Sequence, residues 1–232
     1  SLFFFILRAY FLFSGRVSAE LTMTTETPSL KITEIFLSIQ GEAQTVGKPT
    51  VFVRLTGCPL RCHYCDSEYA FYGGERISIA DILKKVQDYG VKHVCVTGGE
   101  PLAQREARTL MKALCEQGNS VSIDNIDERV SIVMDLKTPA SGELERNDYN
   151  NIALLRANDQ VKFVICDRQD YEWALFKLDE YQLASKVSEV LFSPSYEQIK
   201  PAELVDWIVA DRVDVRFQMQ LHKELWGDKP GR

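Results

Sequence analysis

Short apolar runs rich in β-branched residues alternate with helical patterns from residue 31 onward. Four stretches have the apolar spacing of amphipathic helices, at residues 78–89, 104–117, 169–183 and 201–210. Seven runs predict strands, at residues 31–38, 50–55, 93–97, 131–136, 161–165, 190–193 and 213–220. This alternation predicts βα units, and therefore an α/β fold with a mainly parallel sheet in one domain over residues 31–232.

The first 22 residues do not follow this alternation. Residues 2–13 (LFFFILRAYFLF) are strongly apolar, but a membrane-spanning helix needs about 20 apolar residues. The sequence Val17-Ser18-Ala19 resembles the cleavage site of a signal peptide, which is one interpretation. Against it, the segment has no basic region before the apolar run, and Met23 stands just before the domain-like pattern. We expect residues 1–22 to be an extension outside the fold.

Composition and charge exclude several classes of protein. With 45% hydrophobic and 26% charged residues, the chain resembles an ordinary globular protein. A net charge of −6 argues against a broad nucleic-acid surface, which needs a concentrated basic face. Six cysteines in 232 residues are too sparse for a disulfide scaffold, and three of them stand alone in apolar surroundings. We therefore expect a reduced, cytoplasmic setting, with neither nucleic acid nor membrane as a partner.

The other three cysteines crowd into residues 58–65 (CPLRCHYC), directly after the predicted strand 50–55. Cys58, Cys62 and Cys65 can bind three irons of a [4Fe–4S] cluster, which leaves the fourth iron open for an exogenous ligand. The alternative is a structural zinc site, but a closed zinc site needs four ligands and only His63 lies close. The spacing favours the cluster.

A second feature follows the predicted strand 93–97, where Gly98 and Gly99 precede Glu100 and Pro101. Adjacent glycines let backbone polar groups approach a ligand, because no Cβ stands in the way. An ordinary turn between a strand and a helix would use the same residues, so this motif alone leaves both interpretations open.

Together, the C-x3-C-x2-C spacing and the Gly-Gly-Glu motif resemble the radical S-adenosylmethionine (SAM) superfamily. The surrounding motifs resemble one family within it, the 7-carboxy-7-deazaguanine synthases, over roughly residues 31–228. They are residues 34–42 (EIFLSIQGE), 52–54 (FVR), 57–58 (GC), 65–67 (CDS), 97–101 (TGGEP), 134–139 (MDLKTP), 193–194 (SP) and 220–223 (QLHK). This resemblance implies an incomplete TIM-like (β/α)6 barrel, usually dimeric.

The resemblance also implies a reaction. The family converts 6-carboxy-5,6,7,8-tetrahydropterin to 7-carboxy-7-deazaguanine, with ring contraction and loss of ammonia, on the pathway to queuosine. It uses a [4Fe–4S] cluster, SAM and Mg2+, and SAM cleavage starts the reaction by removing hydrogen from C6 of the pterin. The implied partners are the pterin, an electron donor such as flavodoxin or ferredoxin, and a second copy of the chain.

Site residues are carried over position by position. The cluster ligands are Cys58, Cys62 and Cys65, and Ser67 stands where the family usually has a Thr that ligates Mg2+. The resemblance implies substrate contacts at Ile39, Gln40, Gly41, Glu42, Arg54, Thr97, Gln220 and His222. It implies SAM contacts at Tyr64, Cys65, Asp66, Gly99, Asp135, Leu136, Lys137, Ser193, Pro194, Ser195 and Tyr196.

For each of these residues, a purely structural role is the alternative. Arg54 can clamp the substrate carboxylate through a bidentate fork, or be a surface cation at a strand end. Residues 39–42 can face the pterin, or merely join two strands, and Thr97 can be an ordinary hydroxyl at a strand end. His222 is expected to reach the substrate from the C-terminal strand, although a lone histidine is more often structural.

The chain departs from the family at one place. After the Gly-Gly-Glu helix the family has a strand ending in Glu-Thr-Ser/Asn-Gly, and no such motif exists near Ser120. Either residues 120–125 substitute, or one strand is missing through a splicing or gene-model defect. Two other functions also remain open: a glycyl-radical activating enzyme, and a non-catalytic iron–sulfur or zinc-binding module.

Overall fold

The structure is a computed structural model, and it describes residues 27–122, 129–227, 229 and 231. The predicted extension at residues 1–22 lies outside the described residues. Within the described part, no helix is both long enough and apolar enough to cross a membrane.

The first sheet has five strands in the order β3-β1-β2-β4-β5. β1 pairs antiparallel with both β2 and β3, whereas β2, β4 and β5 run parallel to one another. The strands are β1 (Ser29–Ile39), β2 (Pro49–Leu55), β3 (Glu75–Ser78), β4 (His93–Gly98) and β5 (Ser120–Ser122). The sheet is therefore mixed, and only its β2-β4-β5 part has the parallel pairing that the alternation predicted.

Two helices cover one face of this sheet, α1 (Ile79–Asp88) and α2 (Ala107–Glu116). Because successive side chains of a strand point to opposite faces, Val51, Val53 and Leu55 pack toward the helices. The helix α1 begins where the sequence predicted, since the Ser78 hydroxyl accepts a hydrogen bond from Asp81 N at 3.1 Å. The opposite face of β2, with Phe52 and Arg54, is left for the site.

The second sheet is wholly parallel, with four strands in the order β6-β7-β8-β9. All six residues of β7 are buried, as expected for a parallel strand covered on both faces. Its strands are β6 (Val133–Asp135), β7 (Gln160–Ile165), β8 (Glu189–Pro194) and β9 (Arg216–Phe217). Its helices are α3 (Arg168–Glu180), α4 (Leu183–Lys186) and α5 (Pro201–Asp211), and a last helix, α6 (Leu221–Trp226), follows β9.

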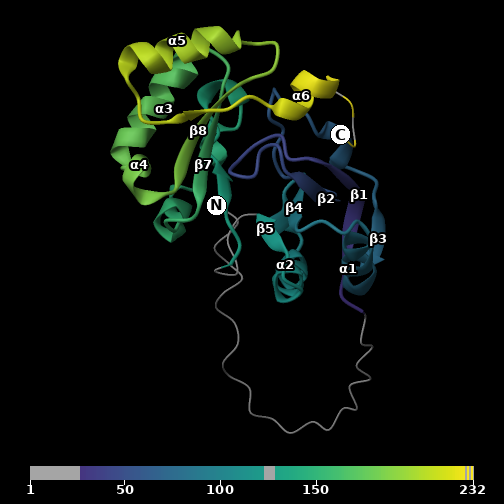
Figure 1. Ribbon diagram of the computed structural model, residues 1–232. Helices are drawn as coiled ribbons and strands as arrows, with labels where there is room; N and C mark the ends of the chain where they lie inside the picture. Colours follow the sequence, from purple (N-terminus) through teal and green to yellow (C-terminus); the bar gives the residue numbers. More distant parts are fainter. Residues whose placement is uncertain (1–26, 123–128, 228, 230, 232) are drawn as a thin grey trace, which may run out of the picture.

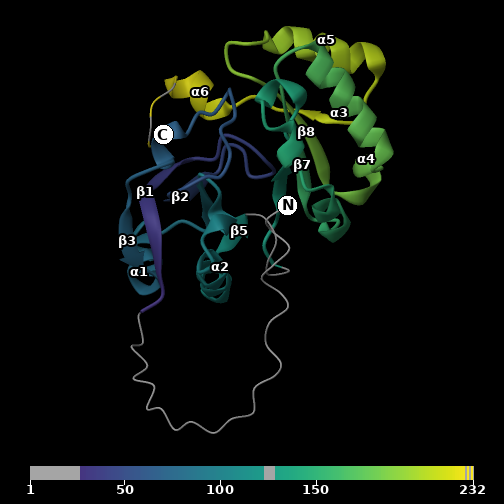
Figure 2. The same ribbon diagram turned by 180° about the vertical axis from the view of Figure 1, so that it is seen from behind.

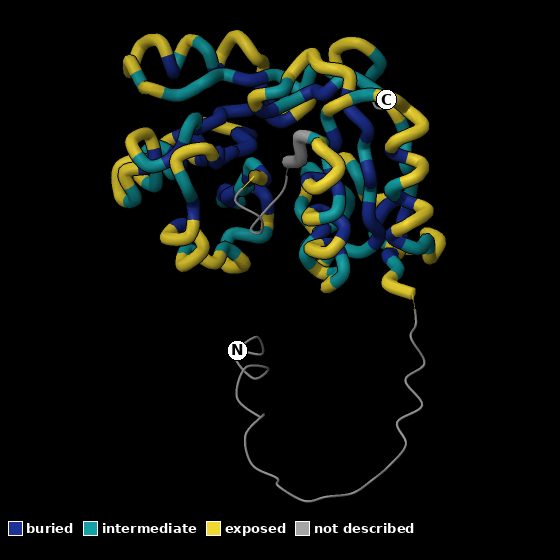
Figure 3. The backbone as a smooth tube through the Cα atoms, turned by 60° about the horizontal axis from the view of Figure 1, so that its bottom comes forward, coloured by how far each residue is buried: buried dark blue, intermediate teal, exposed yellow. Residues whose placement is uncertain are grey.

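Each sheet has its own apolar core. We call the first sheet with α1 and α2 the N-terminal half, and the second sheet with α3, α4 and α5 the C-terminal half (Figures 1 and 2). The chain passes from one core to the other over a short distance, because Val130 is buried in the first core and Ile132 in the second. Buried segments lie inside each half, under more exposed helices (Figure 3).

Short 3-10 helices connect many of these elements. They lie at Glu68–Ala70, Pro101–Ala103, Pro139–Ser141, Leu144–Arg146 and Tyr149–Leu154. Three of them, Pro139–Ser141, Leu144–Arg146 and Tyr149–Leu154, lie in the long connection from β6 to β7, and the first part of this connection takes part in the candidate site.

Most predicted elements are confirmed, with five differences. The structure adds β3, β5, α4 and α6, and the strand predicted at residues 213–220 is reduced to the two residues of β9. The addition of β5 answers part of the missing-strand question, because Ser120–Ser122 pairs in parallel with β4. Residues 123–125, the rest of the proposed substitute, lie outside the described residues. Among the described strands, β5 and β6 end their sheets without pairing with each other.

Candidate functional site

The three clustered cysteines lie on the loop that follows β2, at the carboxyl end of a parallel strand. Cys65 N donates to Cys62 O at 3.1 Å, and Leu60 N donates to the Cys58 sulfur at 3.4 Å. All six cysteines of the chain are described, and none forms a disulfide. No three His, Cys, Asp or Glu side chains in the described residues are grouped to hold one metal ion.

The Arg61 side chain bonds to the backbone of this loop. Its Nη1 donates to Cys58 O at 2.8 Å and to Leu60 O at 2.6 Å. Its guanidinium also lies over the Phe71 ring, 4.1 Å from the centroid. This role was not predicted, and Arg61 makes these contacts while it stays exposed.

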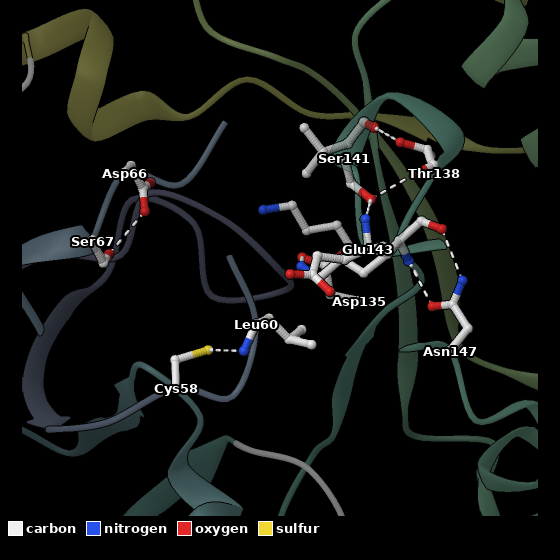
Figure 4. Close-up of polar contacts among 12 residues, drawn as sticks. Cys58, Leu60, Asp66, Ser67, Asp135, Thr138, Ser141, Glu143 and Asn147 are labelled. Carbon is white, nitrogen blue, oxygen red and sulfur yellow. Dashed lines mark hydrogen bonds and ion pairs between the residues drawn. The ribbon is translucent and has the colours of Figure 1, made fainter. Parts of the chain in front are cut away.

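The connection between β6 and β7 holds the cysteine loop from the C-terminal half. Arg61 N donates to Glu143 Oε1 at 2.5 Å, and His63 N donates to Ser141 O at 3.0 Å. Gly142 has φ +74°, and a Cβ there would lie 2.7 Å from the His63 ring. Figure 4 shows Cys58 and Leu60 facing Asp135 and Glu143 across the junction. The cysteine loop therefore belongs to the contact between the two halves.

Burial raises the pKa of the Cys62 and Cys65 thiols above the ordinary cysteine value. For Cys62 the Lys137 ammonium acts in the opposite direction and lowers the pKa, without overcoming burial. Thiolates bind metals and neutral thiols do not, so ligation releases protons here. Burial therefore favours the neutral thiol at Cys62 and Cys65, and binding of a cationic metal would displace these protons.

The Gly-Gly pair is required by close contact with the cysteine loop. Gly98 has φ +141°, and a Cβ there would collide with the Leu55 backbone. A Cβ on Gly99 would collide with Gly57 O and lie 2.9 Å from Cys58 Cβ. The backbone also joins the two loops, since Glu100 N donates to Gly57 O at 2.7 Å. Both glycines thus bring the end of β4 directly against the cysteines.

Two buried polar atoms near the cysteine loop have no hydrogen-bond partner among the described residues. They are Tyr64 OH and Asp135 Oδ1. Lys137 lies between them, with Nζ 2.9 Å from Asp135 Oδ2 and 5.9 Å from the Tyr64 ring centroid. Burial lowers the Lys137 pKa, but Asp135 and Tyr64 raise it above the ordinary value overall, so Lys137 stays a cation. Unsatisfied buried polar atoms are rare, and here they mark a place for a polar ligand.

Among the remaining positions implied as SAM contacts, some are already buried or hydrogen-bonded, and others line a cavity. Leu136 is fully buried in the second core, and its N–H donates to Lys162 O at 3.0 Å. Ser193 donates its hydroxyl to Gln218 O at 2.7 Å. The next residues of the chain line a cavity of about 360 Å³, which contains Pro194, Ser195, Tyr196, Met219 and Gln220. The cavity brings the end of β8 together with the residue before α6.

The turn after β1 meets the C-terminal segment at short range. Leu221 N donates to Gly41 O at 3.1 Å, and a Cβ on Gly41 would collide with His222 Nδ1. The buried Gln218 side chain binds Ala43 twice, accepting from its N–H at 2.8 Å and donating to its C=O at 3.2 Å. Residues 40–42 and 220–222 are therefore neighbours although they stand far apart in the sequence.

His222 lies on α6 and not on a strand, so the expected position of this residue was wrong. The chain leaves the second sheet after Phe217, because the residues that follow bond to the turn after β1. Gln220 then reaches the cysteine loop, with Nε2 3.4 Å from Asp66 Oδ2. Burial lowers the His222 pKa, and Glu42 and Asp66 only partly oppose that effect. His222 is thus mainly neutral at pH 7.

Arg54 is a half-buried cation with defined partners, and not a surface residue, since its side chain is 15% exposed. Its Nε donates to Glu34 Oε1 at 2.8 Å, which also accepts from Tyr69 OH at 2.7 Å. Its Nη1 donates to Ser67 Oγ at 3.2 Å. Thr97 is the register partner of Arg54 on β4, so both side chains face the same side of the sheet.

Asp66 and Ser67 follow the last cysteine. Ser67 Oγ donates to Asp66 Oδ1 at 2.8 Å. Burial raises the Asp66 pKa, but Ser67, Lys223, Lys162 and Arg54 lower it below the ordinary value overall. Asp66 is therefore a stable carboxylate, with two lysines on the C-terminal side. Lys162 was not among the predicted site residues, although a lysine within an apolar strand is itself a sign of a buried ion pair.

The chain is similar to several known proteins. The family model described as "Radical SAM superfamily" matches residues 52–186. A 7-carboxy-7-deazaguanine synthase of Koribacter versatilis is 39% identical over 219 residues, covering 85% of this chain and 97% of the relative. The synthase of Chlorobaculum tepidum is also 39% identical, over 215 residues, covering 88% of this chain and 97% of the relative. The crystal structure of QueE from Escherichia coli superimposes with a TM-score of 0.68 at 22% identity, covering 84% of this chain and 95% of that one.

Proposed function

The chain belongs to the radical SAM superfamily and, within it, to the 7-carboxy-7-deazaguanine synthases, and we propose how its residues divide the work of that reaction. The substrate is 6-carboxy-5,6,7,8-tetrahydropterin, and the product is 7-carboxy-7-deazaguanine, formed with loss of ammonia. This membership selects one of the functions that the sequence left open, ahead of a glycyl-radical activase or a non-catalytic metal module. The observation that carries the assignment is the meeting of the turn 40–42 with His222 beside the cysteine loop.

Membership implies a [4Fe–4S] cluster and SAM. Cys58, Cys62 and Cys65 would hold the cluster through their thiolates. Their common loop, partial exposure and absence of disulfides support this assignment. When bound, the cluster and SAM supply the one-electron chemistry that starts the ring contraction, with electrons from a reductant such as flavodoxin or ferredoxin.

The SAM contacts lie around the junction of the two halves. Gly99 brings the end of β4 to the cysteine loop, where the methionine part binds. The unpaired Tyr64 OH donates a hydrogen bond to this ligand or accepts one from it, and the unpaired Asp135 Oδ1 accepts one from it. Lys137 orients Asp135. Tyr196 and Ser195 contribute from the cavity at the end of β8. Leu136 bonds elsewhere through its N–H and Ser193 through its hydroxyl, so we place both residues at the edge of the ligand.

The pterin binds between the turn after β1 and α6. Gln40, Gly41 and Glu42 face the aminopyrimidinone edge, with Gln220 and His222 opposite, and Ile39 and Thr97 at the periphery. Arg54 receives the substrate carboxylate. Its Nε is bonded to Glu34 and one Nη1 hydrogen to Ser67, so Nη2 and the remaining Nη1 hydrogen are the donors presented to the substrate.

Three finer assignments complete the proposal. Ser67 provides one oxygen to Mg2+, which prefers oxygen ligands and keeps several waters. The two sheets together form the incomplete (β/α)6 barrel of the family, with its seam between β5 and β6. Two chains associate as a dimer.

The test is anaerobic reconstitution of the whole chain with iron and sulfide, followed by incubation with SAM, dithionite, Mg2+ and the pterin. We expect four irons per chain and formation of 7-carboxy-7-deazaguanine. One zinc and no iron would contradict the cluster. Four irons without product would show that the short β5 segment, which lacks the family's Glu-Thr-Ser/Asn-Gly motif, does not support turnover.

A further inference from the structure

Lys162 is a buried cation that the proposed contacts do not use. It lies in the middle of β7, and its side chain is only 10% exposed. Its neighbours Val161 and Phe163 point into the second core, so Lys162 points to the opposite face, toward the N-terminal half. A buried ammonium is costly unless a carboxylate pairs with it.

That carboxylate comes from the substrate turn. Lys162 Nζ lies 2.6 Å from Glu42 Oε1, and the Glu42 side chain is 25% exposed. The second oxygen, Oε2, has no hydrogen-bond partner among the described residues. Since an ionised carboxylate has about four acceptor positions, Lys162 fixes one of them and leaves the others on the open side.

Other charges keep Lys162 in its cationic form. Burial lowers its pKa, but Glu42, Asp135 and Asp66 together raise it above the ordinary lysine value. These three carboxylates come from the turn after β1, from β6 and from the end of the cysteine loop. Lys162 is therefore a cation whose charge is stabilised by carboxylates from three segments at the junction.

We propose that Lys162 is a positioning residue, which orients Glu42 so that its free carboxylate positions meet the N–H donors of the pterin's aminopyrimidinone edge. The inference rests on the proposed function, because it assumes that this edge faces the turn 40–42. Without Lys162 the Glu42 carboxylate loses its fixed orientation and its partner, and the substrate must order it on binding.

The experiment compares equilibrium binding of the pterin, measured anaerobically with SAM present, in the reconstituted wild type and in Lys162→Met. We expect Lys162→Met to weaken binding on the order of tenfold to a hundredfold, because one partner of a buried ion pair is lost. Lys162→Arg keeps the charge and should recover most of the loss. The matched control, Lys112→Met, removes an exposed lysine of α2 whose ion pair within the described part of the chain is with Glu116 at 4.0 Å, and it should bind like the wild type.

A double-mutant cycle separates positioning from a general structural effect. In a Glu42→Gln background, Lys162→Met should change binding less than twofold, since the coupled partner is already altered. Equal loss in both backgrounds would overturn the proposal, and so would unchanged binding in Lys162→Met. If Lys162→Met does not fold or bind iron, Lys162→Gln replaces it with the same expectations.

Failure of the proposed function has a different signature. In that case the wild type itself does not bind the pterin, although iron content and pterin-independent cleavage of SAM are normal, and the inference about Lys162 falls with it. Failure of the inference alone leaves tight binding in the wild type and in every Lys162 variant.

Discussion

The two halves of the molecule are built differently. The N-terminal half has a mixed sheet, in which the antiparallel strand β1 lies beside the parallel strands β2 and β4. The C-terminal half is wholly parallel. Each half has its own apolar core, and no strand pairing joins β5 to β6 among the described residues. The sheets therefore do not hold the halves together through a shared ladder.

Polar contacts at the site end of the sheets join the halves instead. The cysteine loop bonds to Ser141 and Glu143, Glu42 pairs with Lys162, and the turn after β1 bonds to Gln218 and Leu221. The groups proposed to bind cluster, SAM and pterin are thus also the groups that connect the two cores. Binding at the site and association of the halves should therefore be coupled. Substitutions in a core should affect one half, whereas substitutions at the junction should affect binding and the contact between the halves.

The largest effect, on iron content and activity, is expected when a cysteine at the junction is replaced. Replacing a cysteine in the C-terminal half should have little effect. Cys65→Ser should abolish product formation and lower the iron content, because serine is a poor ligand for iron in such clusters. Cys166→Ser changes a buried thiol whose pKa burial raises to about 12, and it should keep iron content and activity. Iron and sulfide analysis with product assay measures both. Loss of iron in Cys166→Ser would break the distinction.

Next in size are matched truncations in the two cores. Leu114 on α2 and Leu183 on α4 are both fully buried, one in each core. Leu114→Ala and Leu183→Ala should each lower the free energy of unfolding of their own half by about 2–5 kcal/mol. Hydrogen exchange read by mass spectrometry should localise the faster exchange to the half that carries the substitution. Equal acceleration in both halves would mean that the two cores unfold as one unit.

A smaller effect is expected where the halves touch, at Gly41. Gly41→Ala should destabilise the protein by about 1–3 kcal/mol, because the added Cβ collides with the His222 ring. The double variant with His222→Ala removes the ring and should recover most of that stability. Chemical denaturation of the four proteins measures the coupling. Additive losses would show that the close approach of α6 to the turn is not the cause.

The sequence predicted the cores better than the junction. Alternating burial on β2 and the mainly apolar run at residues 161–165 of β7, which only Lys162 interrupts, are local patterns, so the strands and the helices that cover them were recognised. The edge strand β3 was missed because Glu75 and Arg76 leave it exposed and without an apolar alternation. The division into two sheets depends on pairing between distant segments, which local periodicity does not encode.

The residues of the candidate site were likewise predictable only where a local sequence pattern marks them. The three cysteines and Gly99 were found because their spacing is specific. Glu34, Arg61 and Lys162 were missed because each acts through a partner that only the fold brings near. His222 was selected by its motif but assigned to the wrong element, since six residues of α6 carry too little periodicity to be recognised.

The smallest expected effect is a pH dependence at the junction. The folded-state pKa of His222 is lowered by burial, whereas the unfolded chain has the ordinary value of about 6.5. Between these two values the unfolded state binds more protons, so stability is full above pH 6.5 and falls as the pH decreases through the window. One histidine contributes at most about 1.4 kcal/mol per pH unit. Anaerobic denaturation between pH 5.5 and 7.5 should therefore give a flatter profile for His222→Gln than for the wild type. Parallel profiles would place the pH sensitivity in other groups, and would remove the evidence that a neutral imidazole at this junction helps to hold the halves together.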